Sequence, residues 1–256
     1  MLLRAFTDLG LTREQNEDSL LLCHAQQVIQ ISAQNRFDTT TTLTPPLLAC
    51  VADGMGGHAG GEVASRLVCN VFGQAYATLS TESTPANAEL TIRKTISQCL
   101  DEMEKQQSAD NALLGMGTTL VGFFSGPCGN LIFHSGDSRA YGLHGKYLRP
   151  LTRDHNEQNK LLSLGVHIEH TGRGLNHCLG GGVRDDFVEI TVLPAEHGYS
   201  AIFLCSDGVS EFCDEDILEE SIATRHLDRI QANVLENGAG DNLTYIAVYF
   251  DAEAKT

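Results

Sequence analysis

Short apolar stretches follow one another along this chain with only turn-forming residues between them. The clearest run is 117–148, where the sequences SGPCGN and LHGK separate three or four strand-like segments. Connections this short join neighbouring antiparallel strands, because a parallel pair needs a crossover of about a dozen residues. The regular alternation of strand and helix that builds a parallel sheet is absent. The sequence therefore predicts sheets that are largely antiparallel.

Helix-like periodicity is confined to a few segments between the strand runs, which favours an α+β fold with helices packed on sheet faces. Helices are expected over 61–79, 86–106, 156–163 and, with one break, 214–236. The expected strands are 19–23, 47–52, 118–124, 130–134, 138–143, 187–193, 200–205 and 243–250.

Two segments look irregular. The stretch 33–46 carries a threonine run and a proline pair, which predicts a mobile loop. The stretch 164–186 carries six glycines and only scattered apolar residues, which predicts a flexible loop or flap. No internal repeat and no linker divides the chain, so one domain is expected over residues 1–256.

The charge balance restricts the partners. The chain has 17 Lys and Arg against 33 Asp and Glu, a net charge of −16. Nucleic-acid binding depends on basic side chains that neutralise phosphates, so this balance argues against it. No stretch approaches the roughly 20 apolar residues of a membrane span, and no secretory signal is visible. Eight cysteines without a C-x-x-C pair indicate small buried hydrophobes. We expect a cytoplasmic protein without membrane or nucleic-acid partners.

Four aspartates stand at the ends of apolar runs, each beside Gly or Asn. They are Asp53, Asp137, Asp207 and Asp241. Carboxylates that converge at a sheet margin repel one another unless a cation neutralises them. A set of oxygen ligands selects hard cations such as Mg²⁺ or Mn²⁺. Asp-Gly and Gly-Asp are also ordinary turn dipeptides, so a purely structural role remains an alternative for each residue.

Seven short motifs carry a resemblance to a known family. In this order and over about residues 7–250, the chain resembles the bacterial type of the metal-dependent protein phosphatases of type 2C. The motifs are Arg13-x-x-Asn16-Glu17-Asp18, Asp53-Gly54-Met55-Gly56-Gly57, Gly117-Thr118-Thr119, Gly136-Asp137-Ser138-Arg139, Leu151-Thr152-x-Asp154-His155, Ser206-Asp207-Gly208 and Gly240-Asp241-Asn242.

The resemblance implies a fold and a first metal site. The fold is a four-layer α-β-β-α sandwich, in which helix pairs flank two antiparallel sheets. Asp53 resembles the carboxylate that bridges two metal ions, and the carbonyl of Gly54 would bind one of them. Asp207 and Asp241 resemble ligands of the first ion.

The remaining site residues also follow from the resemblance. Glu17 and Asp18 resemble the acidic pair that holds the second ion, directly or through water. Asp137, together with Asp207, resembles a third metal site. Arg13 resembles the arginine that binds the phosphate group of the substrate.

The activity implied is hydrolysis of phosphoserine and phosphothreonine in proteins by a water that two metal ions activate. The cofactors would be two Mn²⁺ or Mg²⁺ ions, with room for a third. The partners would be phosphorylated proteins, including a cognate Ser/Thr kinase or its targets, and the protein would be a monomer. The flap, about 156–186, is shorter than is usual in bacterial relatives.

Two other functions are compatible with parts of the sequence. His177-Cys178-x5-Arg184 matches the H-C-x5-R loop of cysteine-dependent phosphatases. That loop should follow a buried strand and open a helix, which lowers the pKa of the thiol. Here polar and glycine-rich residues precede it, and Asp185 and Asp186 follow it. The second alternative is a non-catalytic pseudophosphatase scaffold, against which the retained acidic residues argue.

Overall fold

The computed structural model describes residues 1–55, 60–165, 174–182 and 186–250. Two six-stranded sheets form its centre, and every strand pair in them is antiparallel, as predicted. The first sheet has the order β11 (Tyr147–Pro150), β10 (Arg139–His144), β14 (Ala201–Cys205), β15 (Leu243–Tyr249), β1 (Leu2–Asp8) and β4 (Arg36–Thr42). The second has the order β13 (Glu189–Leu193), β9 (Gly129–Ser135), β8 (Leu120–Gly126), β5 (Leu47–Ala52), β2 (Ser19–His24) and β3 (Gln27–Ser32).

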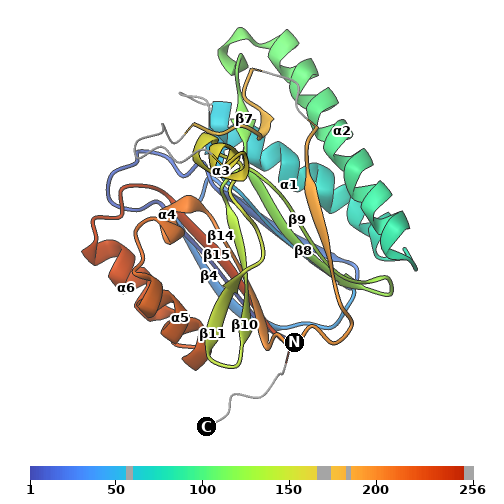
Figure 1. Ribbon diagram of the computed structural model, residues 1–256. Helices are drawn as coiled ribbons and strands as arrows, with labels where there is room; N and C mark the ends of the chain where they lie inside the picture. The colour runs from blue at the N-terminus through green and yellow to red at the C-terminus, as the bar shows by residue number, and fades with distance from the viewer. Residues whose placement is uncertain (56–59, 166–173, 183–185, 251–256) are drawn as a thin grey trace.

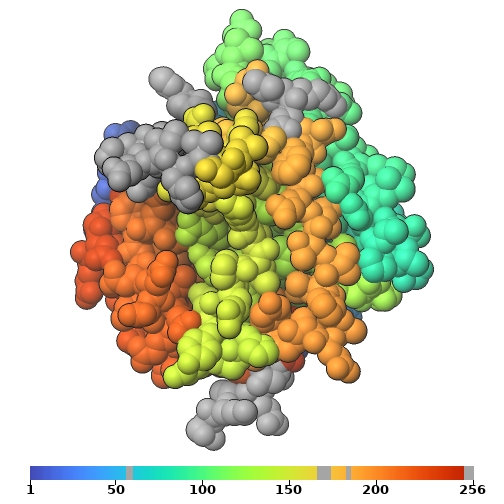
Figure 2. Space-filling view, in the orientation of Figure 1, coloured from blue at the N-terminus to red at the C-terminus, as the bar shows by residue number. Residues whose placement is uncertain are grey.

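Helices cover the outer faces of both sheets, so the predicted four-layer sandwich is confirmed (Figure 1). The helices α1 (Gly60–Leu79) and α2 (Pro85–Ala109) pack on the second sheet. The helices α5 (Glu215–Thr224) and α6 (Asp228–Glu236) pack on the first. Figure 2 shows α5 and α6 on one flank of the molecule and α2 on the opposite flank. No helix in the described ranges is long and apolar enough to cross a membrane.

The continuous apolar runs of the central strands follow from this layering. In β2, Leu20 and Leu22 face the core between the two sheets. The alternate residues Leu21 and Cys23 face the core beneath α1 and α2. Because successive side chains of a strand point to opposite faces, a strand covered on both faces is apolar at every position.

Local signals explain the helix ends. Thr84 caps α2 by accepting a hydrogen bond from the Asn87 amide at 3.3 Å, and Pro85 occupies the first helical position. The predicted break within 214–236 is confirmed. Arg225 has a left-handed backbone with φ of 62°, which ends α5 before α6 begins at Asp228.

The prediction of a mobile loop over 33–46 is wrong. Residues Arg36–Thr42 form β4, an edge strand paired along its whole length with β1. The threonines that suggest a polar loop are β-branched, and their exposure alternates along the strand, as an edge strand requires. The bidentate contact of Arg4 with Asp38, at 3.2 and 3.0 Å, further joins the two strands. The strands β1, β3 and β11 were also not predicted.

Several small elements complete the region around the expected flap. The strands β6 (Gly54–Met55), β7 (Gly117–Thr118) and β12 (Leu179–Gly180) form a three-stranded sheet. A short helix, η1 (Asn111–Leu113), leads into β7. The predicted short helix is present as α3 (Glu157–Ser163). Residues 166–173 and 183–185 of the expected flap lie outside the described residues.

Candidate metal centre

The four aspartates at strand margins converge. Asp53 follows β5, Asp137 follows β9, Asp241 precedes β15, and Asp207 begins the short helix α4 (Asp207–Ser210) after β14. Burial raises the pKa of Asp53 well above its ordinary value, and the charges of Asp18, Asp207, Asp241 and Asp137 raise it further. A carboxylate feels four others in this way only where they crowd together at short range. Both sheets therefore deliver acidic groups to one place.

Asp18 is the most deeply buried member of the cluster, with an exposed fraction of 2%. Its Oδ2 accepts a hydrogen bond of 2.9 Å from the hydroxyl of Ser206. Burial raises the pKa of Asp18 to about 8; its hydrogen bonds oppose the rise, and the charge of Asp207 adds to it. Without a counter-charge, this carboxyl holds a proton near neutral pH.

Two buried carboxylate oxygens, Asp18 Oδ1 and Asp207 Oδ1, have no hydrogen-bond partner among the residues described. Burial also raises the pKa of Asp137 to about 7 and shifts the pKa of Asp207 upward. An unsatisfied buried oxygen is costly, and several beside one another are costlier. Divalent cations with oxygen preference would satisfy both the unpartnered oxygens and the charge, so the donor set fits Mg²⁺ or Mn²⁺.

The backbone around Asp53 is held closely. The Asp53 amide donates to the hydroxyl of Thr119 at 3.1 Å, and the hydroxyl of Thr118 donates to the Asp53 carbonyl at 2.8 Å. A Cβ atom on Gly54 would lie 2.3 Å from the carbonyl oxygen of Gly61 and 2.7 Å from that of Glu17. Only glycine fits position 54, and it brings this turn against the start of α1.

Asn242 joins the two ends of the chain at the cluster. Its side-chain amide donates to the carbonyls of Leu9 and Gln15 at 2.9 and 3.1 Å. Its Oδ1 accepts from the amide of Glu17 at 2.8 Å. Asn242 therefore shapes the backbone beside Asp241 and Glu17, and its side-chain amide group is hydrogen-bonded to main-chain atoms.

Arg13 lies at the edge of the cluster with a half-exposed side chain. Its Nη2 donates to Oδ2 of Asp241 at 2.6 Å, and this hydrogen bond raises the pKa of the guanidinium. Glu17 lies nearby: burial raises its pKa, and the charge of Arg13 opposes the rise. The structure thus places all eight expected site residues in one region, where the guanidinium of Arg13 lies beside several carboxylates. They are Arg13, Glu17, Asp18, Asp53, Gly54, Asp137, Asp207 and Asp241.

Some supporting residues were not assigned a role from the sequence. Ser206 bonds Asp18, and Thr119 bonds both Asp53 and the hydroxyl of Ser138, the latter at 2.7 Å. Ser206 stands directly beside Asp207, and Thr119 belongs to the motif Gly117-Thr118-Thr119, so membership of the motifs was the available signal. It could not indicate which atom each hydroxyl would contact, because those partners lie far away in the sequence.

The surroundings of Cys178 do not support the cysteine alternative. The two-residue strand β12 follows it, and no helix begins between it and β13 in the residues that the structure describes. The thiol donates a weak hydrogen bond to the carbonyl of Gly180 at 3.8 Å. In this contact the thiol is protonated, whereas a nucleophilic thiolate accepts hydrogen bonds at the sulfur. Arg184 and Asp185 lie outside the described residues.

Comparison with known proteins agrees with this geometry. The model of the family Protein phosphatase 2C matches residues 27–245. The serine/threonine phosphatase stp of Listeria monocytogenes is 31% identical over 221 residues, which cover 81% of this chain and 86% of that protein. The serine/threonine protein phosphatase PstP of Mycobacterium tuberculosis is 31% identical over 94% of this chain and 43% of its own length.

Solved structures are similar over nearly the whole chain. The serine/threonine phosphatase Stp1 from Staphylococcus aureus superposes with a TM-score of 0.78 at 25% identity, covering 98% of this chain and 96% of that one. The catalytic domain of PstP in complex with two manganese ions superposes with a TM-score of 0.70 at 26% identity, covering 98% and 100%.

Proposed function

The chain belongs to the protein phosphatase 2C family of metal-dependent protein serine/threonine phosphatases, and we propose that its carboxylate cluster is the catalytic centre. The observation that carries this proposal is the pair of buried, unpartnered oxygens Asp18 Oδ1 and Asp207 Oδ1 among mutually repelling aspartates. Burying these carboxylates without cations does not stabilise the fold, whereas bound cations make their burial favourable.

We propose a division of the ligands that follows the resemblance noted above. Asp53 would bridge two ions and the Gly54 carbonyl would bind one of them, which agrees with the tight turn at this glycine. Asp207 and Asp241 would hold the first ion.

For the remaining ions, we propose that Glu17 and Asp18 hold the second, directly or through water. Asp137 would hold a third together with Asp207. The raised pKa of Asp137, about 7, supports a group that becomes fully ionised only beside a cation.

The chemistry divides between the ions and the protein. Bound divalent ions supply an activated water and neutralise charge on the phosphoryl group. Arg13 would bind the phosphoryl oxygens, and its hydrogen bond to Asp241 holds the guanidinium at the edge of the cluster. Removing that positive charge should weaken substrate binding. No protein nucleophile is needed, so we expect no covalent phosphoenzyme.

The ligands indicate the class of the resident metal, which is a divalent cation that prefers oxygen donors. Oxygen donors accept both Mn²⁺ and Mg²⁺, and we propose Mn²⁺ or Mg²⁺ in two sites and a weaker third. The complex of PstP with two manganese ions supports the choice of a dinuclear centre.

We propose that the chain acts as one catalytic domain and as a monomer, in the cytoplasm, on phosphorylated proteins that include a Ser/Thr kinase or its targets. All eight cysteines lie in described parts of the chain and none forms a disulfide, which fits a reducing compartment. Light scattering of the purified protein tests the monomer, since a dimer would double the mass.

Hydrolysis of a phosphothreonine peptide with Mn²⁺, with and without excess EDTA, tests the main proposal. We expect activity that EDTA removes and Mn²⁺ restores. Asp207→Asn should lose turnover, whereas Asp101→Asn, an exposed aspartate on α2, should keep it. Activity that survives EDTA, or an active Asp207→Asn variant, would contradict the assignment.

A further inference from the structure

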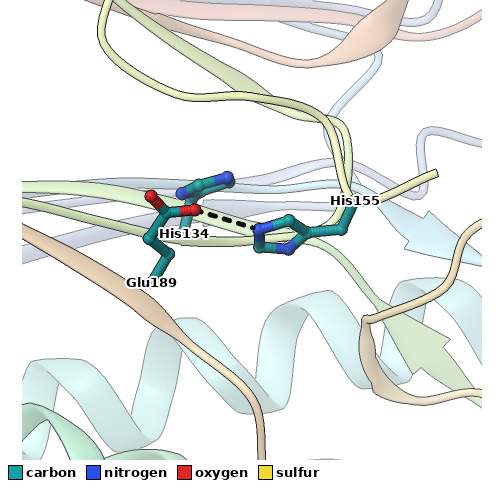
Figure 3. Close-up of side chains that lie close together, drawn as sticks. All are labelled: His134, His155 and Glu189. Carbon is teal, nitrogen blue, oxygen red and sulfur yellow. Dashed lines mark hydrogen bonds and ion pairs between the residues drawn. The ribbon is translucent and has the colours of Figure 1, made fainter. Parts of the chain in front are cut away.

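Two histidines and a glutamate gather on the second sheet, outside the carboxylate cluster (Figure 3). His134 lies on β9 and is directly paired with Glu189 on β13. His155 comes from the segment after β11, and its ring stacks on that of His134 with centroids 4.2 Å apart. His134 is 2% exposed, whereas the side chain of Glu189 is 52% exposed. The group is thus anchored in the protein and open to solvent on one side.

The hydrogen bonds of the group leave one nitrogen of His134 available as a ligand, whereas His155 must change tautomer to bind a cation. His134 Nε2 lies 3.1 Å from the carbonyl oxygen of Arg153, so it carries the proton and leaves a lone pair on Nδ1. An imidazole whose second nitrogen donates to a backbone carbonyl has the usual arrangement of a metal-binding histidine. His155 Nε2 lies 3.5 Å from Glu189 Oε2, and Figure 3 shows this carboxylate turned toward the rings.

We propose that His134, His155 and Glu189 form a separate binding site for a transition-metal cation of the Zn²⁺ class. One ligand atom from each residue lies within 4.8 Å of the other two. A tetrahedral Zn²⁺ shell with ligands at about 2.0–2.1 Å has ligand-to-ligand spacings of about 3.3 Å. To bind one ion, the two rings must turn out of their stacked arrangement and the exposed Glu189 side chain must move, and water takes the fourth position.

The chemistry separates this site from the carboxylate cluster. Imidazole nitrogens favour Zn²⁺ and similar ions, whereas Mg²⁺ and Mn²⁺ prefer oxygen ligands. Burial lowers the pKa of His155 to about 4, with the neighbouring His134 adding to the effect, and burial also lowers the pKa of His134. Both rings are therefore neutral near pH 7, so a cation binds without a net release of protons.

Occupation of the site has a local consequence at His155. Its Nδ1 accepts a hydrogen bond of 3.2 Å from the Gly136 amide, which requires the ring proton to be on Nε2. A metal ion at Nε2 moves that proton to Nδ1, so the Gly136 amide loses its acceptor. We expect faster hydrogen exchange at Gly136 when the site is filled.

Zinc binding to the full chain in saturating Mn²⁺ tests the proposal, with a chromophoric chelator as competitor. One Zn²⁺ per chain should bind beyond the Mn²⁺-competed sites. Glu189→Gln changes an exposed side chain and should weaken this binding about tenfold or more, in line with loss of one ligand. His134→Gln should do the same. His226→Gln, at an exposed histidine elsewhere, should bind as the unaltered protein does.

The metal centre proposed above is tested independently, because Asp207→Asn should keep this Zn²⁺ while it loses turnover. Three results would overturn the zinc site. They are absence of Zn²⁺ binding in excess Mn²⁺, unchanged affinity in Glu189→Gln, and loss of the Zn²⁺ in Asp207→Asn with retention in Glu189→Gln. If His134→Gln does not fold, Glu189→Gln alone decides the question.

Discussion

Replacing Asp18 by asparagine should stabilise the metal-free protein. The carboxyl of Asp18 is buried, and its pKa rises from 3.8 to about 8 in the fold, mainly through burial. A group with a raised folded pKa binds more protons folded than unfolded, so stability falls as pH rises between those two values. Asparagine removes the charge, keeps an acceptor for Ser206, and places a donor where Oδ1 now lacks a partner.

The size of the effect follows from the same shift. At pH 7 the carboxyl of Asp18 is mostly protonated in the fold but ionised in the unfolded chain. Relative to pH 3 or below, the metal-free protein therefore loses up to about 4 kcal/mol of unfolding free energy at this site. Asp18→Asn should recover a large part of this amount at pH 7 and almost none at pH 3. In Mn²⁺ the order should reverse, because the variant lacks one of the proposed ligands.

Urea unfolding in EDTA at several pH values between 3 and 8, repeated in Mn²⁺ near pH 7, measures both effects. Asp101→Asn serves as the control for removal of one negative charge from an exposed position. The reasoning is refuted if Asp18→Asn is no more stable than the parent in EDTA at pH 7. It is equally refuted if Mn²⁺ stabilises the variant as strongly as it stabilises the parent.

Three further substitutions probe other parts of the site. Arg13→Ala should lower kcat/KM by about ten- to a hundredfold, mostly through KM, because the proposed charge-assisted contact to the phosphoryl group is lost. Steady-state kinetics checks this, with substitution of the exposed Arg149 by alanine as the control. An unchanged KM in Arg13→Ala would contradict the prediction. Gly208→Ala would place a Cβ 1.9 Å from a backbone oxygen of the turn before β15, so we expect a loss of about 1–3 kcal/mol in urea unfolding and weaker Mn²⁺ binding. Gly174→Ala, whose Cβ meets nothing within 4 Å, is its control, and equal behaviour of the two would count against the tight turn. Cys178→Ser should keep activity within about twofold, since no thiolate is used, and a dead variant would revive the cysteine mechanism.

The strands buried along their whole length were predicted from their continuous apolar runs. The run 47–52 was visible because all six of its residues are buried, and it forms β5. Threonines at Thr39–Thr42 pointed to a loop, because a half-exposed edge strand has no apolar run to distinguish it. The partner that orders β4 is β1, about 30 residues earlier in the chain, and the pairing is invisible in local composition.

The site was predictable as a set of residues but not as a network. Asp53, Asp207 and Asp241 stood out because each ends or begins an apolar run beside glycine or asparagine. The contact between Ser206 and Asp18 spans 188 residues, and nothing local to either one indicates it. The cluster of His134, His155 and Glu189 was missed for the same reason, since it forms across β9, β13 and a loop.

The order of the sheets explains why this centre needs the whole chain. Asp241 begins β15, which lies beside β1 in the first sheet, and Asp18 precedes β2 in the second. Asn242 ties the segment between β1 and β2 to the turn before β15 through three hydrogen bonds. The acidic groups thus come from both sheets, and their spacing is set by how the sheets pack face to face. A change in the core between the sheets should therefore alter metal binding without touching any proposed ligand, because these residues stand at strand ends that this core positions.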